Sequence, residues 1–257
     1  MILKSHLEKQ ESHMKKNNKK VVLLIVEGDS EESFLIDSLR ESFEQHRIRF
    51  SVYGGDILYD LSKGKKAIKS IVGDTVKEFM LKNKFKVDDL FAVLHIIDTD
   101  GCFISKEDIV VDENQETLTL YHLESISVKS DTQKGKIAER NEQKSKNIQT
   151  MRTTNTVHSN NINYRMYYFS RNLEHILFDE MNPEKASKVL AVEQFLERSR
   201  IPMEELLKQF MDSSKETDHE ANYLESWTHI SEGTASLQRL TNLPLLFEFI
   251  RLNTKYE

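Results

Sequence analysis

Three acidic residues follow two apolar segments at points where a parallel sheet would bring them together. Glu27 comes directly after the six apolar residues 21–26, and Asp98 and Asp100 follow the almost wholly apolar segment 90–97. Carboxylates held close together repel one another, and their pKa values rise unless a cation neutralises them. A hard divalent ion such as Mg²⁺ or Mn²⁺ prefers carboxylate and water oxygens. The residue types therefore predict a metal site at Glu27, Asp98 and Asp100, and such a site can activate water.

Each acidic residue also has a plainer explanation, because acidic and small polar residues often end a strand and cap the next helix. We favour that explanation for Asp29 and Ser30. Metal binding is the better explanation for Glu27 together with Asp98 and Asp100, since two separate strand ends carry the same chemistry.

The elements that would position these residues follow the order β-α-β-α-β. Long apolar runs are typical of strands buried on both faces of a parallel sheet. The expected strands are 21–26, 48–53 and 90–97, and the expected helices follow Asp29 and span about 65–82. Functional residues of open parallel sheets gather at the carboxyl ends of the strands. We therefore expect the ends of the first and third strands to lie side by side, with Glu27 and the two aspartates facing one cleft that solvent reaches.

A polar insertion and a helical region make up the rest of the chain. Residues 129–163 contain few large apolar side chains, which predicts a mobile loop or a loose helical insertion. Alternation over 117–128 indicates an antiparallel or edge excursion that pairs with 108–111. Strand composition returns at 164–170, and helices are expected over 172–181, 183–199, 202–213, 218–231 and 234–252. Most apolar residues of these helices are expected in a core, and a partner-binding face is the alternative.

The polar insertion contains a basic segment, although the chain as a whole is acidic. The protein has a net charge of −6, but residues 129–152 hold seven basic and three acidic residues. An acidic site repels a phosphate substrate unless positive surface lies nearby. We therefore select as nucleic-acid contacts Lys134, Lys136, Arg140, Lys144 and Lys146. A solvated segment with incidental charge is the alternative.

The acidic segments resemble a known family. An apolar strand ending in Glu27-Gly28, then a helix, then a strand ending in Asp98-Thr99-Asp100 is similar to the TOPRIM domain of topoisomerases, primases and OLD-family nucleases. The segment 27–31, Glu-Gly-Asp-Ser-Glu, resembles the version in OLD-like and RloB-like bacterial proteins. The resemblance covers roughly residues 19–178, and the segment 169–174 resembles the part of RloB-like chains that ends in a glutamate, here Glu174.

This resemblance implies an architecture and a set of site residues. The fold would be a TOPRIM-like, mostly parallel sheet flanked by helices over 20–178, with a basic N-terminal tail or helix at 1–19 and an all-helical subdomain at 179–257. Glu27 would be a metal ligand or a general acid and base, Asp98 and Asp100 would hold Mg²⁺, and Glu31 would be a further acidic ligand.

The resemblance also implies a function. TOPRIM-like proteins of this kind cleave DNA or RNA phosphodiesters, often as restrained toxins or effectors of phage defence and abortive infection that work with an ABC-type ATPase. A TOPRIM-fold regulatory or binding subunit that docks on an ATPase with little catalysis is the alternative from a different class. Topoisomerase action is not expected, because the chain offers no strand-passage domains.

Other classes fit the sequence less well. A response-regulator receiver needs a phospho-accepting aspartate, and a HAD phosphatase places Asp-x-Asp on its first strand, whereas here the pair follows the third. The P-loop signature is missing from the chain. The longest apolar runs are well short of 18 residues, and the first 20 residues are charged where a signal peptide needs an apolar core, so we expect a soluble cytoplasmic protein that starts at Met1 or Met14.

Overall fold

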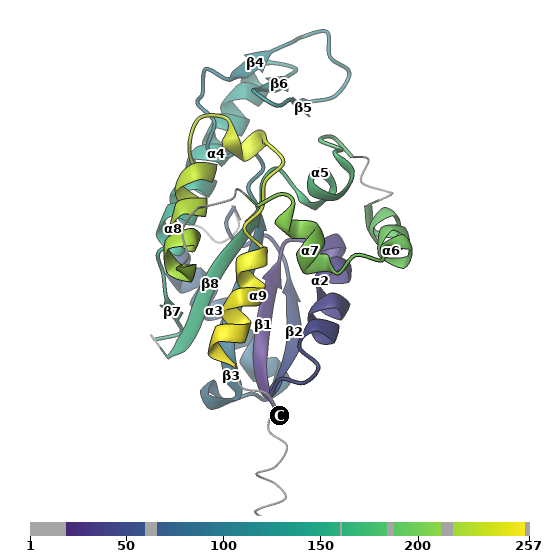
Figure 1. Cartoon of the computed structure of the whole chain (residues 1–257). Helices are drawn as coiled ribbons and strands as arrows, with labels where there is room; N and C mark the ends of the chain where they lie inside the picture. The colour runs from purple at the N-terminus through teal and green to yellow at the C-terminus, as the bar shows by residue number, and fades with distance from the viewer. Residues whose placement is uncertain (1–18, 60–65, 160, 184–187, 212–217, 255–257) are drawn as a thin grey trace, which may run out of the picture.

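The computed structural model describes residues 19–59, 66–159, 161–183, 188–211 and 218–254 (Figure 1). Of the expected N-terminal tail or helix at 1–19, all but Lys19 lies outside the described residues, as does Met14. Among the residues described, no helix has the length and apolar character needed to cross a membrane.

A five-stranded sheet in the order β2-β1-β3-β8-β7 forms the centre of the protein. Its strands are β1 (Lys20–Val26), β2 (Ile48–Gly54), β3 (Leu90–Asp98), β7 (Thr156–Val157) and β8 (Ile162–Phe169). The first three strands and β8 pair in parallel, and the short β7 pairs antiparallel with β8 at the edge. The expected α/β class with a mostly parallel sheet flanked by helices is confirmed.

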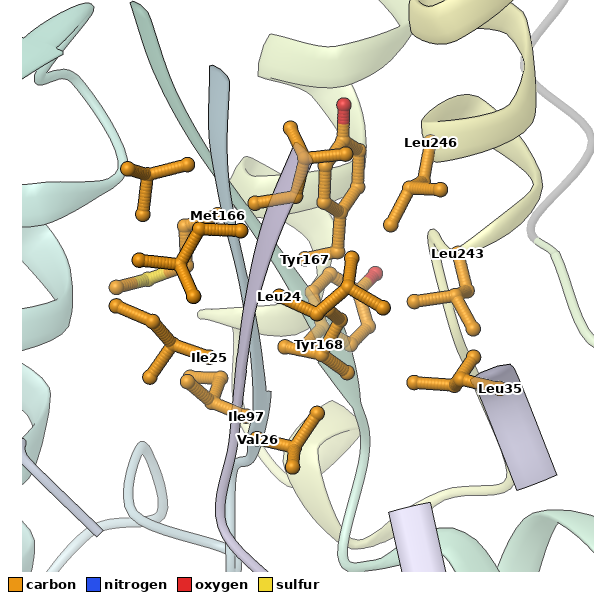
Figure 2. Packing of buried hydrophobic residues seen from close by; sticks show 14 of the residues in the cluster. Leu24, Ile25, Val26, Leu35, Ile97, Met166, Tyr167, Tyr168, Leu243 and Leu246 are labelled. Atoms are coloured by element: carbon orange, nitrogen blue, oxygen red, sulfur yellow. The ribbon is translucent and has the colours of Figure 1, made fainter. Parts of the chain in front are cut away.

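Helices cover both faces of this sheet, which explains the unbroken apolar run of β1. Residues 21–26 have no exposed surface. The helices α2 (Asp29–Ser42) and α9 (Pro244–Asn253) pack on one face, and α3 (Ile68–Asn83) and α4 (Asp131–Met151) pack on the other. In Figure 2, Leu24 and Tyr167 point toward Leu246, whereas Ile25 and Met166 point to the opposite side of the sheet. A strand buried on both faces has no polar side to alternate with.

The strand order places a topological switch point between β1 and β3. The chain leaves β1 through α2 to reach β2 on one side, and returns through α3 and the 3-10 helix η2 (Val87–Asp89) to β3 on the other side. Right-handed connections that leave in opposite directions put their helices on opposite faces and open a crevice at the carboxyl ends of the two strands.

The C-terminal helices share one core with the sheet. They are α5 (Leu173–Phe178), α6 (Lys188–Arg198), α7 (Met203–Lys208), α8 (His219–Ile230), η4 (Ala235–Leu237) and α9. Trp227 and Leu243 belong to the same buried cluster as the residues of β1 and β3. The prediction of one helix over 234–252 is wrong in its middle, because Thr241 forms a β-bridge with Phe169. The helix α9 begins only at Pro244, a residue suited to a first helical turn.

The polar insertion is ordered and contains a long helix. A second sheet precedes it and consists of three short strands, β4 (Ile109–Val111), β5 (Thr119–Tyr121) and β6 (Ile126–Val128). The pairing of β4 with β6 confirms that 108–111 pairs with the segment 117–128. This small sheet lies at one end of the molecule, next to α4 (Figure 1).

Of the two alternatives predicted for the polar insertion, the mobile loop is wrong for residues 131–151 and the helix is confirmed, although α4 is a regular 21-residue helix and not a loose one. Its low apolar content reflects a single buried face, which carries Ile137, Asn141, Lys144, Ile148 and Met151. The other residues of the helix can be polar because they face away from the core.

We predict that Ser130→Ala destabilises the protein by about 1 kcal/mol, because the Ser130 hydroxyl caps α4 by accepting a hydrogen bond from the Gln133 backbone N–H at 3.2 Å. Urea unfolding of the full chain measures this loss. The matched control Ser145→Ala changes the same side chain inside the helix, where alanine has the higher helix propensity, and should cost nothing. Equal losses in both variants would contradict the capping role.

Candidate active site

Glu27 and Asp98 meet at the switch point of the sheet. The strands β1 and β3 are neighbours and parallel, and the Asp98 backbone N–H donates to Oε1 of Glu27 at 3.2 Å. The side chains of Glu27 and Asp100 keep 14% and 25% of their surface exposed, so solvent reaches the site. The prediction that the ends of the first and third strands lie side by side is confirmed.

The turn after β3 brings Asp100 back toward this point. Asp100 and Gly101 have φ angles of 51° and 65°, in the left-handed region that favours glycine. A Cβ atom on Gly101 would lie 2.4 Å from Cδ2 of Leu237, so a larger residue has no room there. The Asp100 backbone N–H donates to the carbonyl of Arg171 at 3.1 Å, which joins this turn to the segment after β8.

Lys144 lies between the carboxylates of Glu27 and Asp100. Its Nζ is 2.7 Å from Oδ2 of Asp100, 3.2 Å from Oε1 of Glu27 and 3.4 Å from Oε2 of Glu27. The side chain is only 1% exposed, and its two acidic neighbours keep its pKa well above the ordinary value despite burial. The structure therefore places the Lys144 ammonium inside the acidic site and not on the outer face of α4, and nucleic-acid contact by this residue stays a prediction.

Arg140 is also turned inward. One guanidinium nitrogen donates to the Tyr121 hydroxyl at 2.8 Å and the other donates to the carbonyl of Asp100 at 2.9 Å. These bonds hold its guanidinium against the turn after β3. The structure therefore places Arg140 at the site rather than on an outer basic face. Lys136 and Lys146 are exposed and Lys134 is half-buried, so nucleic-acid contact stays a prediction for these three.

Cations occupy both carboxylate oxygens of Asp100. Lys144 contacts Oδ2, and Nη1 of Arg171 lies 3.2 Å from Oδ1. The Arg171 guanidinium also stacks on the ring of Tyr121, 3.4 Å from its centroid. Burial opposes ionisation, but Lys144, Arg140 and Arg171 together hold the pKa of Asp100 at about 2. Asp100 is therefore ionised at neutral pH.

The environment favours the protonated forms of Asp98 and Glu27, in contrast to Asp100. Within the described part of the chain, Oδ1 of Asp98 is buried without a hydrogen-bond partner. Burial, followed by the charges of Glu31, Glu27 and Asp100, raises the pKa of Asp98 well above its ordinary value. Burial raises the pKa of Glu27 to about 8, with Lys144 opposing the shift.

Glu31 adds negative charge on the other side of Asp98. It lies in the first turn of α2, and a Cβ atom on Gly28 would come 3.0 Å from Oε2 of Glu31. Burial and the nearby carboxylate of Glu174 raise the pKa of Glu31. Glu174 is buried as well: Lys188 binds its Oε2 at 3.0 Å, while its Oε1 has no hydrogen-bond partner among the described residues. The acidic region thus extends from Asp100 to Glu174.

The chemistry of these residues fits a hard divalent ion, although the present spacing does not. Among the described residues, no group of three or more His, Cys, Asp or Glu side chains is arranged to hold a metal ion. Lys144 occupies the space between Glu27 and Asp100. The donor set is nevertheless made of carboxylate oxygens, and the partnerless Oδ1 of Asp98 is a ligand atom not engaged elsewhere.

The sequence did not single out Arg171 as a site residue, and it did not predict the place of Lys144 between the carboxylates, although each had a signal. Arg171 follows the end of β8, which neighbours β3, so the rule that selected Glu27 and Asp98 also applies to it. Lys144 lies four residues before Ile148 and seven after Ile137, which places it on the apolar stripe of α4.

In comparisons with known proteins, no family model, curated protein or solved structure matches this chain. The resemblance to TOPRIM domains therefore stays a prediction that rests on the short acidic motifs.

We predict that Asp98→Asn stabilises the metal-free protein at pH 8 by about 1 kcal/mol or more, one pKa unit being worth about 1.4 kcal/mol. The folded-state pKa of Asp98 is raised, so the folded protein keeps a proton that the unfolded chain has lost. Stability from this group is present at low pH and falls as pH rises above the unfolded value near 4. The variant should therefore lose less stability than the wild type between pH 5 and pH 8.

Urea unfolding in EDTA at several pH values measures this difference. The matched control Asp88→Asn makes the same change at the exposed residue 88, just before the other end of β3, and should follow the wild-type pH dependence. An Asp98→Asn variant that is less stable than the wild type across this pH range would contradict a raised pKa of Asp98 in the folded protein.

Proposed function

We propose that this protein is a divalent-metal-dependent phosphodiesterase that cleaves nucleic acid. One observation carries the proposal: Glu27, Asp98 and Asp100 converge at the switch point of a parallel sheet, where burial and the neighbouring carboxylates raise the pKa of Glu27 and of Asp98. Ligands and metals bind at such switch points because the strand ends and loops converge there. A divalent cation would favour the ionised forms of these carboxylates, because its oxygen ligands are carboxylates.

Each residue would have its own task. Glu27 and Asp98, with Asp100 and Glu31 beside them, would hold Mg²⁺ or Mn²⁺, which when bound lowers the pKa of water and neutralises charge on a phosphate. Glu27, whose pKa is about 8, can hold or release a proton near neutral pH. Arg171 is fixed by Tyr121 and by Asp100, and presents a planar guanidinium suited to phosphate oxygens.

The resemblance to OLD-like and RloB-like proteins supports a more specific setting. We propose a TOPRIM-like effector or toxin of antiviral defence that acts in the cytoplasm with an ABC-type ATPase partner. The helical region after residue 178 is the surface proposed for that partner. Both DNA and RNA are substrates to be tested.

A second candidate function is supported by Lys144. Its ammonium already fills the space between Glu27 and Asp100, and both oxygens of Asp100 are paired. If that pairing is permanent, the protein would be a TOPRIM-fold binding or regulatory subunit that docks on an ATPase without catalysis. The two candidates differ in whether a metal ion binds and a phosphodiester is cut.

We predict that Asp98→Asn and Glu27→Gln each lower Mg²⁺-dependent or Mn²⁺-dependent hydrolysis by at least about 100-fold, because each removes a charge that stabilises the transition state through the metal. Labelled single-stranded and double-stranded DNA and RNA serve as substrates. The exposed Asp88→Asn variant is the matched control and should keep wild-type activity. Full activity in Asp98→Asn would overturn the metal site. Inactivity of the wild type on every substrate with either metal would favour the binding subunit.

We predict that the triple variant Lys134→Gln, Lys136→Gln, Lys146→Gln binds nucleic acid more weakly and with a smaller dependence on salt. Each lost phosphate contact should lower the slope of log affinity against log salt by about 0.9 for duplex DNA or about 0.7 for a single strand. Titrations in EDTA at several salt concentrations measure the slope. The control triple variant removes the same charge near the amino-terminal end of the central strand β3, at Lys82, Lys84 and Lys86, which are exposed. Equal slopes in both variants would assign the outer face of α4 to another task.

A further inference from the structure

Lys144 occupies the centre of the acidic site. One ammonium group contacts carboxylates from two separate strand ends, at 2.7 Å from Asp100 and at 3.2 Å from Glu27. The lysine is more deeply buried than either partner, with 1% of its side chain exposed against 25% for Asp100 and 14% for Glu27. A buried ammonium with two carboxylate partners acts as the counter-ion of the pair.

This counter-ion balances only part of the site. Lys144 supplies one positive charge and touches Glu27 and Asp100, whereas the buried Oδ1 of Asp98 has no hydrogen-bond partner in the described part of the chain. A divalent ion carries twice the charge and binds several carboxylate oxygens at once. An ammonium and a metal ion sharing the same carboxylates would repel each other at short range. Metal binding at these residues therefore requires the ammonium to move.

The structure offers space beside the lysine. A groove of about 690 Å³ runs between α4 and the segment after β3, and it is lined by Asn141 and Ser145, the residues three before and one after Lys144. Its charged lining consists of Glu139, Glu142, Lys106 and Lys146. The lysine side chain has a flexible four-carbon stem, so its ammonium can move without movement of the helix.

We propose that Lys144 is the resident counter-ion of the acidic site and that a divalent cation displaces its ammonium toward the groove beside α4. This inference rests on the proposed metal-dependent function and adds the residue that sets its metal affinity. In the absence of metal, the lysine keeps Glu27 and Asp100 together without repulsion. When metal binds, the ion pairs of Lys144 are lost, which weakens the apparent affinity for the ion.

The first test uses the wild-type protein. Lysines are acetylated under limiting reagent, with EDTA or with Mg²⁺ at a concentration that shifts the melting temperature, and modification is read by mass spectrometry. In EDTA, Lys144 should react far more slowly than Lys82, which is exposed in α3. With Mg²⁺, the reaction of Lys144 should speed up severalfold while that of Lys82 stays unchanged.

The second test measures Mg²⁺ binding by calorimetry in Lys144→Gln and in the control Lys82→Gln. Lys144→Gln should bind Mg²⁺ at least about tenfold more tightly than the wild type, because the ion no longer has to break charge-assisted hydrogen bonds. Lys82→Gln, which removes an exposed charge in α3, should bind as the wild type does. If Lys144→Gln does not fold, the labelling of the wild-type protein decides.

The outcomes separate this inference from the proposed function. Mg²⁺ that binds the wild type but leaves Lys144 protected, or that binds Lys144→Gln no more tightly, would overturn the displacement and leave the metal site standing. If Mg²⁺ binds neither the wild type nor Lys144→Gln, the metal site and the displacement are both overturned.

Discussion

The ion pairs of Lys144 with Glu27 and Asp100 are the interaction on which the arrangement of this protein depends. They join the end of β1, the turn after β3 and the middle of α4, which are far apart in sequence. Bringing these charges out of water is costly, and removing one partner of a buried pair typically costs about 3–5 kcal/mol. The helix α4 is therefore held to the sheet by charge as much as by its few apolar residues, and the site and the insertion depend on each other.

Much of the central fold follows from simple patterns in the sequence. The unbroken apolar runs of β1 and β3 are explained by helices on both faces of a parallel sheet. The rule that function gathers at carboxyl strand ends places Glu27 beside Asp98, and the hydrogen bond from the Asp98 backbone to Glu27 at 3.2 Å reflects that neighbourhood. These predictions succeed because strand burial and sheet topology depend on local composition and chain order alone.

The remaining features depend on contacts that local patterns do not contain. Residues 129–163 are poor in apolar side chains because the buried face of α4 includes Asn141 and Lys144, so a count of hydrophobic residues misses an ordered helix. The segment before Pro244 has helical composition, yet Thr241 pairs with Phe169 beside the sheet. In both places tertiary pairing, by charge or by backbone hydrogen bonds, overrides the local tendency of the sequence.

Tyr121, in strand β5 of the small sheet, contacts two of the charged side chains around Asp100. Its ring stacks against the guanidinium of Arg171, and its hydroxyl accepts a hydrogen bond from Arg140. One aromatic side chain thus separates two like charges and sets the distance between them. A rigid shift of β5 would move both guanidinium groups relative to the turn after β3. The electrostatic potential at the opening of the site therefore depends on the position of the small sheet of β4, β5 and β6.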